Sequence, residues 1–351
     1  MRVMELRQPA PVASGPLLAA ERPTPEPGPG ELRLAVAATA VCRTDLQLAE
    51  GDLEARRLPI VPGHQVVGRV TAIGEGVSGW ELGERAGVTW LAGSDGTCRY
   101  CRSGRENLCL HATFTGWDRD GGYADEMTVR AEVAVRLPDA FADADAAPLL
   151  CGGVVGHRAL RLAGVPGLPG LAEDASAATE HRPEPFRLGL YGFGASASLV
   201  IQEAIHLGCV VHVASRSAEE RERAVDLGAA TTGGYAEPPA DPLDAAITFA
   251  PVGSVVVFAL HDLAPGGTVV INAIHLDQVP AFPYPLLWEE RGLRSVANVT
   301  HRDAVEFLEL AAAIPIRTAV RPYPLTDANA ALADLAAGRI GAAAAVLIPE
   351  R

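Results

Sequence analysis

Cysteine and histidine are concentrated in one part of this chain in a way that indicates metal binding. Five of the six cysteines lie between residues 42 and 151, and His64 lies among them. Three of these thiols, Cys98, Cys101 and Cys109, follow one another closely. In a chain otherwise poor in cysteine, such grouping is more typical of a metal site than of disulfide bonds.

A second set of possible ligands is spread along the sequence: Cys42, His64 and Cys151. A tetrahedral zinc ion with three protein ligands keeps its fourth position open for substrate, which is the catalytic arrangement. Taken singly, each residue could also be a buried thiol or a core histidine. The residues that flank them therefore decide the interpretation.

A glycine-rich turn points to a dinucleotide. It reads Gly192-x-Gly194-x-x-Ala197, between a predicted strand at 187–191 and a predicted helix at 195–207. The first glycine allows the tight turn, the second lets the backbone approach a pyrophosphate, and the small third residue lets the helix pack on the strand. The alternative is a purely structural turn, which the strand–turn–helix context disfavours.

The end of the next predicted strand, 209–214, indicates which dinucleotide is bound. NAD enzymes place Asp or Glu there, whereas this chain continues with Ser215-Arg216-Ser217. All 29 basic residues are arginine, so any phosphate must be held by guanidinium groups, backbone N–H groups or helix dipoles. We therefore expect NADP(H) to be favoured over NAD(H).

Two regions of the sequence have different patterns, and these patterns predict the elements that position the residues above. The first half has short predicted strands at 32–36, 66–73 and 85–90, glycine turns and a short helix around Leu46, which is typical of a β-rich domain. Residues 187–298 alternate strand and helix, which predicts a doubly wound parallel sheet. We also expect a helical segment at 147–163, a surface loop at 164–186, a buried Cys209, and two helices and two strands in 302–351.

Composition narrows the partners and the location. The chain has 351 residues and a formal net charge of −14, which argues against nucleic acid and anionic membranes as partners. No apolar run reaches the length of a membrane span, and the N-terminus lacks the apolar core of a signal peptide. We therefore expect a cytoplasmic protein.

Five motifs in order make the chain resemble the zinc-dependent alcohol dehydrogenases of the medium-chain dehydrogenase/reductase superfamily, near their bacterial cinnamyl-alcohol-dehydrogenase-like branch. They are Val41–Asp45, Pro62–Gly68, Cys101–Cys109, Pro148–Gly153 and the turn at Gly192. The resemblance implies an α/β protein with a GroES-like β-rich catalytic domain, residues 1–155 and 299–351. A Rossmann nucleotide-binding domain, residues 156–298, would be inserted in it.

The resemblance also implies roles for single residues. The catalytic zinc ligands would be Cys42, His64 and Cys151. Thr44 would hydrogen-bond the substrate oxygen and relay its proton, Asp45 would orient His64, and Arg43 would meet the cofactor pyrophosphate. Trp90 and Trp117 fall where the family lines its substrate pocket, although either could belong to the core.

The second zinc site of the family departs from its usual pattern here. Relatives use four cysteines, and this chain has aspartate in the first position, giving the set Asp95, Cys98, Cys101 and Cys109. A carboxylate can also ligate zinc. We expect this site to bind zinc, and hence two zinc ions per chain. The alternative is that the loop at residues 95–109 binds no metal.

Two further departures concern Gln65 and Gln47. The family usually has glutamate after the histidine ligand, where this chain has Gln65, and many relatives have a proton-relay histidine at the position of Gln47. A neutral Gln65 leaves the zinc site more positive. Because Gln47 cannot titrate, proton exit would run through Thr44, the ribose and water.

Together these features predict a zinc-dependent oxidoreductase that interconverts a small-molecule alcohol with an aldehyde or ketone using NADP(H). Zinc would act as a Lewis acid on the substrate oxygen, and the nicotinamide would carry the hydride. The rivals are a zinc-free quinone or enoyl reductase on the same fold and a non-catalytic NADPH-binding protein. Family members form homodimers or homotetramers, which is an expectation from resemblance.

Overall fold

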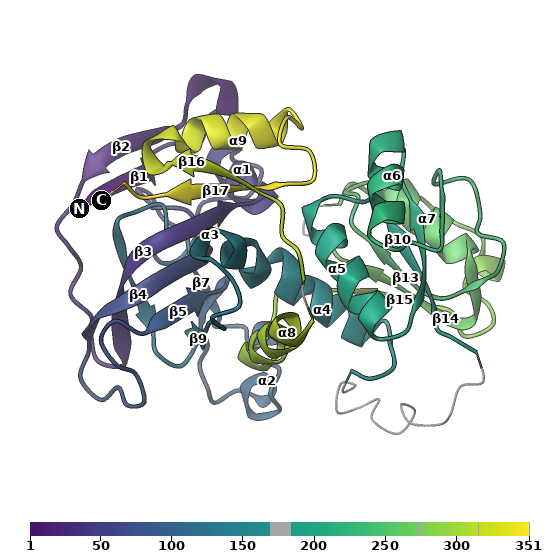
Figure 1. Cartoon of the computed structure of the whole chain (residues 1–351), viewed down its shortest axis with the longest axis horizontal. Coiled ribbons are helices and arrows are strands. Elements are labelled where there is room, and N and C mark those ends of the chain that lie inside the picture. The colour runs from purple at the N-terminus through teal and green to yellow at the C-terminus, as the bar shows by residue number, and fades with distance from the viewer. Residues whose placement is uncertain (169–183, 274–275, 315, 351) are drawn as a thin grey trace. The chain divides into compact units, whose positions relative to one another are not determined.

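The computed structural model describes residues 1–168, 184–273, 276–314 and 316–350. Most of the surface loop predicted at 164–186 therefore lies outside the described residues. The chain divides into two compact units, and Figure 1 labels most of their elements. The first comprises Met1–Val154, Asn298–Ala313 and Thr318–Arg351, and the second Val155–Ala297 and Ile314–Arg317. Residues 314–317 thus group with the second unit, whereas the sequence assigned them to the first.

The first unit is built on a twisted sheet in the order β16-β17-β3-β4-β5-β9, with β8 also paired to β3. Buried and half-buried residues alternate along the first part of β3, as expected for a strand with two different faces. Two further pairs, β1 with β2 and β6 with β7, form separate two-stranded sheets. The strands of the unit are β1 (Arg2–Leu6), β2 (Leu17–Glu21), β3 (Glu31–Val41), β4 (Gln65–Ile73), β5 (Arg85–Val88), β6 (Leu91–Gly93), β7 (Thr113–Phe114), β8 (Glu126–Arg130), β9 (Val135–Arg136), β16 (Val320–Pro324) and β17 (Ala344–Ile348).

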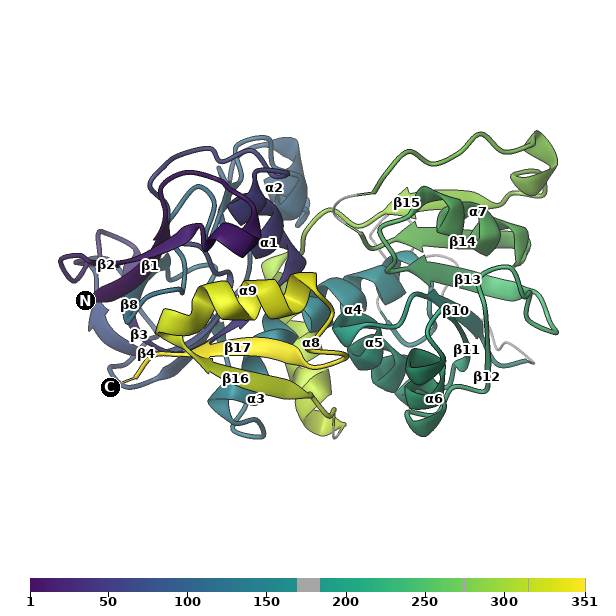
Figure 2. The same ribbon diagram turned by 90° about the horizontal axis from the view of Figure 1, so that it is seen from above.

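Short helices complete this unit. They are α1 (Arg43–Glu50), α2 (Arg99–Arg102), α3 (Asp143–Ala146), α8 (His301–Ala313) and α9 (Ala328–Ala336), with 3₁₀ turns η1 (Val12–Ser14), η2 (Glu106–Leu108), η3 (Ala147–Leu150) and η5 (Leu325–Asp327). Figure 2 shows α9 running beside β17, so the C-terminal tail adds strands and a helix to the N-terminal sheet. One core, which includes Leu6, Val41 and Leu347, joins the two ends of the chain.

Two predicted elements of this unit differ in the structure. The strand expected at 85–90 ends at Val88, and Trp90 lies in the gap before β6. The helical segment expected at 147–163 is broken at Cys151, where η3 ends and α4 (Gly152–Leu162) begins. Cys151 has φ −132° and ψ −72°, which is not helical. Gly153 in α4 approaches the Phe307 ring so closely that a Cβ there would lie 2.4 Å from it.

The second unit is a six-stranded parallel sheet in the order β12-β11-β10-β13-β14-β15. Its elements are β10 (Arg187–Tyr191), α5 (Ala195–His206), β11 (Val210–Ala214), α6 (Ala218–Asp226), β12 (Thr231–Gly233), β13 (Leu243–Thr248), α7 (Gly253–His261), β14 (Leu263–Ile271), η4 (Tyr284–Leu286) and β15 (Gly292–Ser295). The strand order runs in opposite directions from β10 and from β13. Right-handed crossovers then place α5 and α6 on one face and α7 on the other.

This arrangement confirms the predicted fold class, a GroES-like β-rich unit together with a Rossmann unit. Apolar residues of β10, β11, β13 and α5 fill the core of the second unit, and Cys209 is buried in it. None of the described helices is long and apolar enough to span a bilayer.

Candidate functional site

Three distant segments bring Cys42, His64 and Cys151 together. Each offers one ligand atom, and these atoms lie within 4.8 Å of one another. Cys42 caps the N-terminus of α1, His64 directly precedes β4, and Cys151 occupies the break between η3 and α4. His64 is buried and both thiols are half-buried. Two thiols and one imidazole suit Zn²⁺, and three protein donors leave room for one more ligand.

The carboxylate of Asp45 holds two of these segments in register. It accepts hydrogen bonds from the backbone N–H of Cys42 at 2.9 Å and of Gly63 at 3.2 Å, and its Oδ1 lies 3.2 Å from His64 Nδ1. The same side chain therefore caps α1 and orients the imidazole. Because Nδ1 faces Asp45, Nε2 of His64 is the nitrogen left for a metal.

Gly63 makes this approach possible. Its φ is +96°, and a Cβ at this position would lie 2.4 Å from the Tyr123 ring. Any other residue would strain the backbone and displace the segment that carries His64.

The protein groups of this cluster favour negative charge on one of its two sulfurs, that of Cys42. A hydrogen bond with Cys151 lowers the pKa of Cys42 well below its usual value, against the opposing effect of burial. That shared hydrogen bond and burial raise the pKa of Cys151. Burial lowers the pKa of His64, but the charges of Asp45 and Cys42 and their hydrogen bonds outweigh it and raise that pKa to about 10. A zinc ion here would replace the protons of His64 and Cys151, because its ligands are neutral imidazole and thiolate.

The neighbours of the cluster occupy varied positions. Thr44 is buried, and its backbone N–H donates to Cys42 Sγ at 3.3 Å. Arg43 is exposed at the start of α1. Gln65 is buried at the first position of β4, and Gln47 is half-buried on α1.

An aromatic cluster lies beside His64. The ring centroid of Trp90 is 6.0 Å from that of His64, and Trp90 stacks on Trp117 at 5.8 Å with an interplanar angle of 23°. Phe114 contacts both tryptophans, and the Arg56 guanidinium lies 3.8 Å from the centroid of the Trp117 ring. Sequence reasoning found the two tryptophans but not Phe114 or Arg56, whose neighbours along the chain carry no motif.

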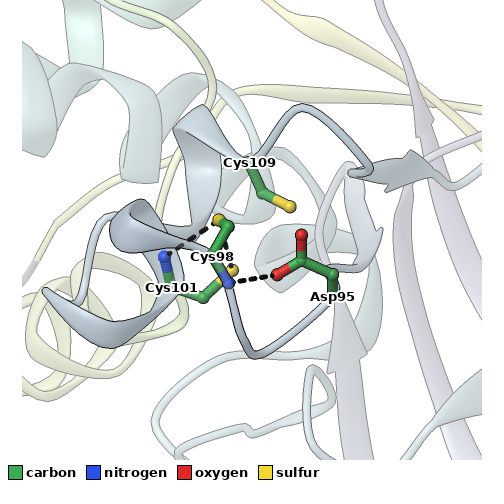
Figure 3. Close-up of side chains that lie close together, drawn as sticks. All are labelled: Asp95, Cys98, Cys101 and Cys109. Carbon is green, nitrogen blue, oxygen red and sulfur yellow. Dashed lines mark hydrogen bonds between the residues drawn. The ribbon is translucent and has the colours of Figure 1, made fainter.

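The second predicted metal set also converges, as Figure 3 shows. The ligand atoms of Asp95, Cys98, Cys101 and Cys109 lie within 4.8 Å of one another. The sulfurs of Cys98 and Cys101 are 3.5 Å apart, and the Cys101 N–H donates to Cys98 Sγ at 3.5 Å. Three thiols and a carboxylate form a four-donor set of the closed, structural kind.

Asp95 shapes this lobe as well as facing it. Its Oδ1 accepts the backbone N–H groups of Thr97 and Cys98, each at 2.8 Å. These two hydrogen bonds hold the pKa of the Asp95 carboxyl well below its usual range, so it is ionised. A hydrogen bond from the Cys101 N–H likewise lowers the pKa of Cys98. A hydrogen bond with Ser94 lowers the pKa of Cys101, but burial and hydrogen bonds with Cys98, Asp95 and Cys109 outweigh it and raise that pKa to about 11. The loop therefore presents an anionic carboxylate and favours the thiolate at Cys98.

The glycine turn follows β10, at the point where the strand order reverses. Ligands of open parallel sheets bind at such switch points. Gly192 has φ +91°, and a Cβ there would lie 2.9 Å from the backbone nitrogen of Ala250. A Cβ at Gly194 would meet nothing within 4 Å, so this glycine leaves open space for a ligand. Ala197 is completely buried in the core under α5.

The end of β11 differs from the sequence interpretation. Ser215 is buried, and its hydroxyl donates to the carboxylate of Glu220. Arg216 is exposed. The strand-end sequence contains no acid, yet the structure places one there, from the first turn of α6. The only sequence signal was that Glu220 follows an N-cap serine, Ser217, by three residues.

Comparisons with known proteins agree with this architecture. The alcohol dehydrogenase GroES-like domain matches residues 28–139. Probable alcohol dehydrogenase AdhA of Mycobacterium tuberculosis is 44% identical over 354 residues, which cover 99% of this chain and 97% of that protein.

Two solved structures share the fold. A cinnamyl alcohol dehydrogenase of Sorghum bicolor superposes with a TM-score of 0.83 at 24% identity, covering 99% of this chain and 97% of that one. A structure of CAD from Helicobacter pylori complexed with NADP(H) has a TM-score of 0.83 at 19% identity and covers 99% of both chains. With a relative this similar along its whole length, the chain belongs to the zinc-dependent alcohol dehydrogenase family of the medium-chain dehydrogenase/reductase superfamily, and it is an oxidoreductase.

Proposed function

We propose that the protein interconverts an alcohol with an aldehyde or ketone, using a catalytic zinc ion and NADP(H). The observation that carries the proposal is the convergence of Cys42, His64 and Cys151 within 4.8 Å, beside Trp90. A zinc-free reductase would have no use for this donor set. A bound zinc ion would supply Lewis acidity toward the substrate oxygen, and the nicotinamide would supply or accept the hydride.

The chain's own residues would hold the substrate and move its proton. Asp45 contacts Nδ1 of His64, so the imidazole would bind the metal through Nε2. The Thr44 hydroxyl, next but one to Cys42, would hydrogen-bond the substrate oxygen and take the alcohol proton during oxidation. Trp90 and Trp117 would form an apolar wall of the substrate pocket. In the reverse direction Thr44 would return the proton to the oxygen.

The second cluster would hold a structural zinc ion, so that each chain carries two. The ionised Asp95 and the three thiols match the donors and number of a closed tetrahedral site. This ion would stabilise the lobe between β6 and β7 without contacting substrate.

The cofactor would be NADP(H) in preference to NAD(H). The turn Gly192-x-Gly194 would receive the pyrophosphate, with Arg43 as a further contact. Arg216 is exposed and follows Ser215 directly, so its guanidinium is available to a 2′-phosphate. The Helicobacter pylori neighbour of the same fold was solved in complex with NADP(H), which supports a nicotinamide dinucleotide as the cofactor here.

The protein would form a homodimer or a homotetramer, in which copies of the chain associate through the second unit. β15 is the edge strand of its sheet, and no strand among the described residues pairs with its outer side. Tyr284 and Trp288, just before it, are 66% and 61% exposed. Pairing with a second copy would cover both features, and light scattering would measure the subunit count.

The first test is NADPH oxidation with a panel of aldehydes, comparing the wild type with Cys151→Ser. The variant should lose turnover and catalytic zinc while still binding NADPH, because the metal cluster and the glycine turn belong to different units. Cys209→Ser is the matched control, since Cys209 is buried but lies outside both clusters.

The outcomes separate the rivals. Persistent carbonyl reduction by Cys151→Ser after chelation would refute the zinc mechanism and favour a quinone or enoyl reductase. NADPH binding by a zinc-loaded wild type that turns over no aldehyde would favour a non-catalytic binding protein.

A further inference from the structure

The carboxylate of Glu220 is fixed at the end of β11 by two serines. Ser217 caps α6, and its Oγ accepts the Glu220 backbone N–H at 3.3 Å. The Ser215 hydroxyl then donates to Glu220 Oε2, and Ser215 is only 1% exposed. The position where a Rossmann strand meets the adenosine ribose therefore carries a held negative charge.

The neighbouring arginines are not equivalent. Arg221 donates to the Ser215 carbonyl at 2.6 Å, and Arg223 donates to the Phe193 carbonyl in the glycine turn at 2.7 Å. Both guanidiniums are thus engaged by backbone oxygens. Arg216 is exposed and makes no hydrogen bond or ion pair with any described residue. Of these three arginines, Arg216 is therefore the one whose guanidinium can offset the charge of Glu220.

The charges of Glu220 and Arg216 both affect the pKa of the Tyr235 hydroxyl. Burial is the main cause that raises the pKa of its hydroxyl. The Glu220 charge raises this pKa further, whereas the Arg216 charge lowers it. The half-buried Tyr235 hydroxyl therefore lies within the electrostatic reach of both charges.

The two cofactors would meet this pair differently. The 2′-hydroxyl of NAD(H) is a donor that a carboxylate accepts, whereas the 2′-phosphate of NADP(H) is repelled by a carboxylate and attracted by a guanidinium. Glu220 Oε1 has no hydrogen-bond partner among the described residues, so an acceptor remains.

We propose that Glu220 is a second cofactor-specificity residue. Its carboxylate serves as the acceptor for the unphosphorylated ribose and holds the NADP(H) preference below what Arg216 alone would give, so that the enzyme uses both cofactors. This inference rests on the proposed dinucleotide site.

The test compares Glu220→Gln with Glu219→Gln in the full-length protein. Glutamine at 220 can still accept from Ser215, so the strand end and the helix cap are retained. Glu219 is the adjacent, exposed acid, and its variant makes the same change of charge. Calorimetry would measure binding of 2′,5′-ADP and of 5′-AMP, and kcat/KM would be measured with NADPH and NADH.

Glu220→Gln should raise the affinity ratio of 2′,5′-ADP to 5′-AMP by about tenfold over Glu219→Gln, the size expected for one charge-assisted contact. Glu220→Ala should shift the ratio in the same direction, which guards against an effect peculiar to glutamine. Equal ratios in the two glutamine variants would overturn the inference. A wild type with no NADPH preference, whose ratio rises in Glu220→Gln, would refute the proposed preference and leave the inference standing.

Discussion

Asp45 offers the sharpest test of how the metal cluster is held together. Its carboxylate is 3% exposed and faces three donors: the Cys42 N–H at 2.9 Å, the Gly63 N–H at 3.2 Å and His64 Nδ1 at 3.2 Å. The substitution Asp45→Asn keeps the shape and one acceptor oxygen. That oxygen can serve Gly63 and His64, and the amide NH₂ then faces the Cys42 N–H, donor against donor.

The expected cost follows from these contacts. One buried N–H loses its acceptor, which costs about 1–3 kcal/mol, and the remaining two hydrogen bonds lose their charge assistance. We therefore expect the free energy of unfolding to fall by about 3 kcal/mol. The zinc affinity should fall roughly 10–100-fold, the usual effect of losing a residue that orients a metal ligand.

Chelator competition would measure zinc affinity, and denaturant unfolding would measure stability. Glu50→Gln is the matched control, because Glu50 lies on the same helix and accepts a backbone N–H, that of Val12, away from the cluster. A zinc affinity of Asp45→Asn within threefold of the control would refute the orienting role. A loss of stability with unchanged zinc affinity would reduce Asp45 to a helix cap.

Three further predictions concern other parts of the site. Asparagine in Asp95→Asn can still accept from Thr97 and Cys98 but is a poorer zinc ligand, so elemental analysis should find one zinc ion per chain instead of two. Its Tm should be roughly 5 °C lower than that of the control Asp139→Ala, which changes an exposed acid. An unchanged metal content would show that zinc binding by this cluster does not depend on Asp95. Arg216→Ala should lower the NADPH-to-NADH ratio of kcat/KM by roughly ten- to a hundredfold. The double variant Ser215→Asp/Arg216→Ala should prefer NADH. An unchanged ratio in Arg216→Ala would show that Arg216 faces solvent in the cofactor complex. Arg56→Ala should raise KM for aromatic aldehydes about two- to fivefold with kcat nearly unchanged, because the cation over Trp117 is worth about 0.5–1 kcal/mol at an exposed site. The control is Arg57→Ala, which breaks the surface ion pair with Asp120. Equal KM values in the two variants would contradict a role for Arg56 in holding the aromatic wall.

Local patterns predicted the central strands of the Rossmann unit but not its two edge strands, β12 and β15. Apolar runs bounded by glycine marked β10 and β11, and the first agrees residue for residue with the predicted strand at 187–191. Such strands are buried on both faces, so their composition alone identifies them. The three-residue β12 was not predicted, because Thr231–Gly233 is too short and too polar to show a pattern.

The cysteine motifs named the metal ligands, but only the folded chain explains their placement. Cys42 is also the cap of α1, and the expected helix at 147–163 breaks at Cys151 so that this thiol stands free of helical backbone. Neither feature follows from ligand spacing, because each depends on what packs around the segment. Gly153 against Phe307 is one such constraint, between residues far apart in sequence.

The fold class, the family and the residue types available for chemistry could be predicted without a structure, because they depend on composition and on spacing within single elements. Tertiary structure decided which groups face one another across elements. Ser215-Arg216-Ser217 indicated a strand end without an acid, yet the turn into α6 returns Glu220 to Ser215. Side-chain contacts of this kind depend on where the chain reverses and how its rotamers point, which spacing along one strand does not encode.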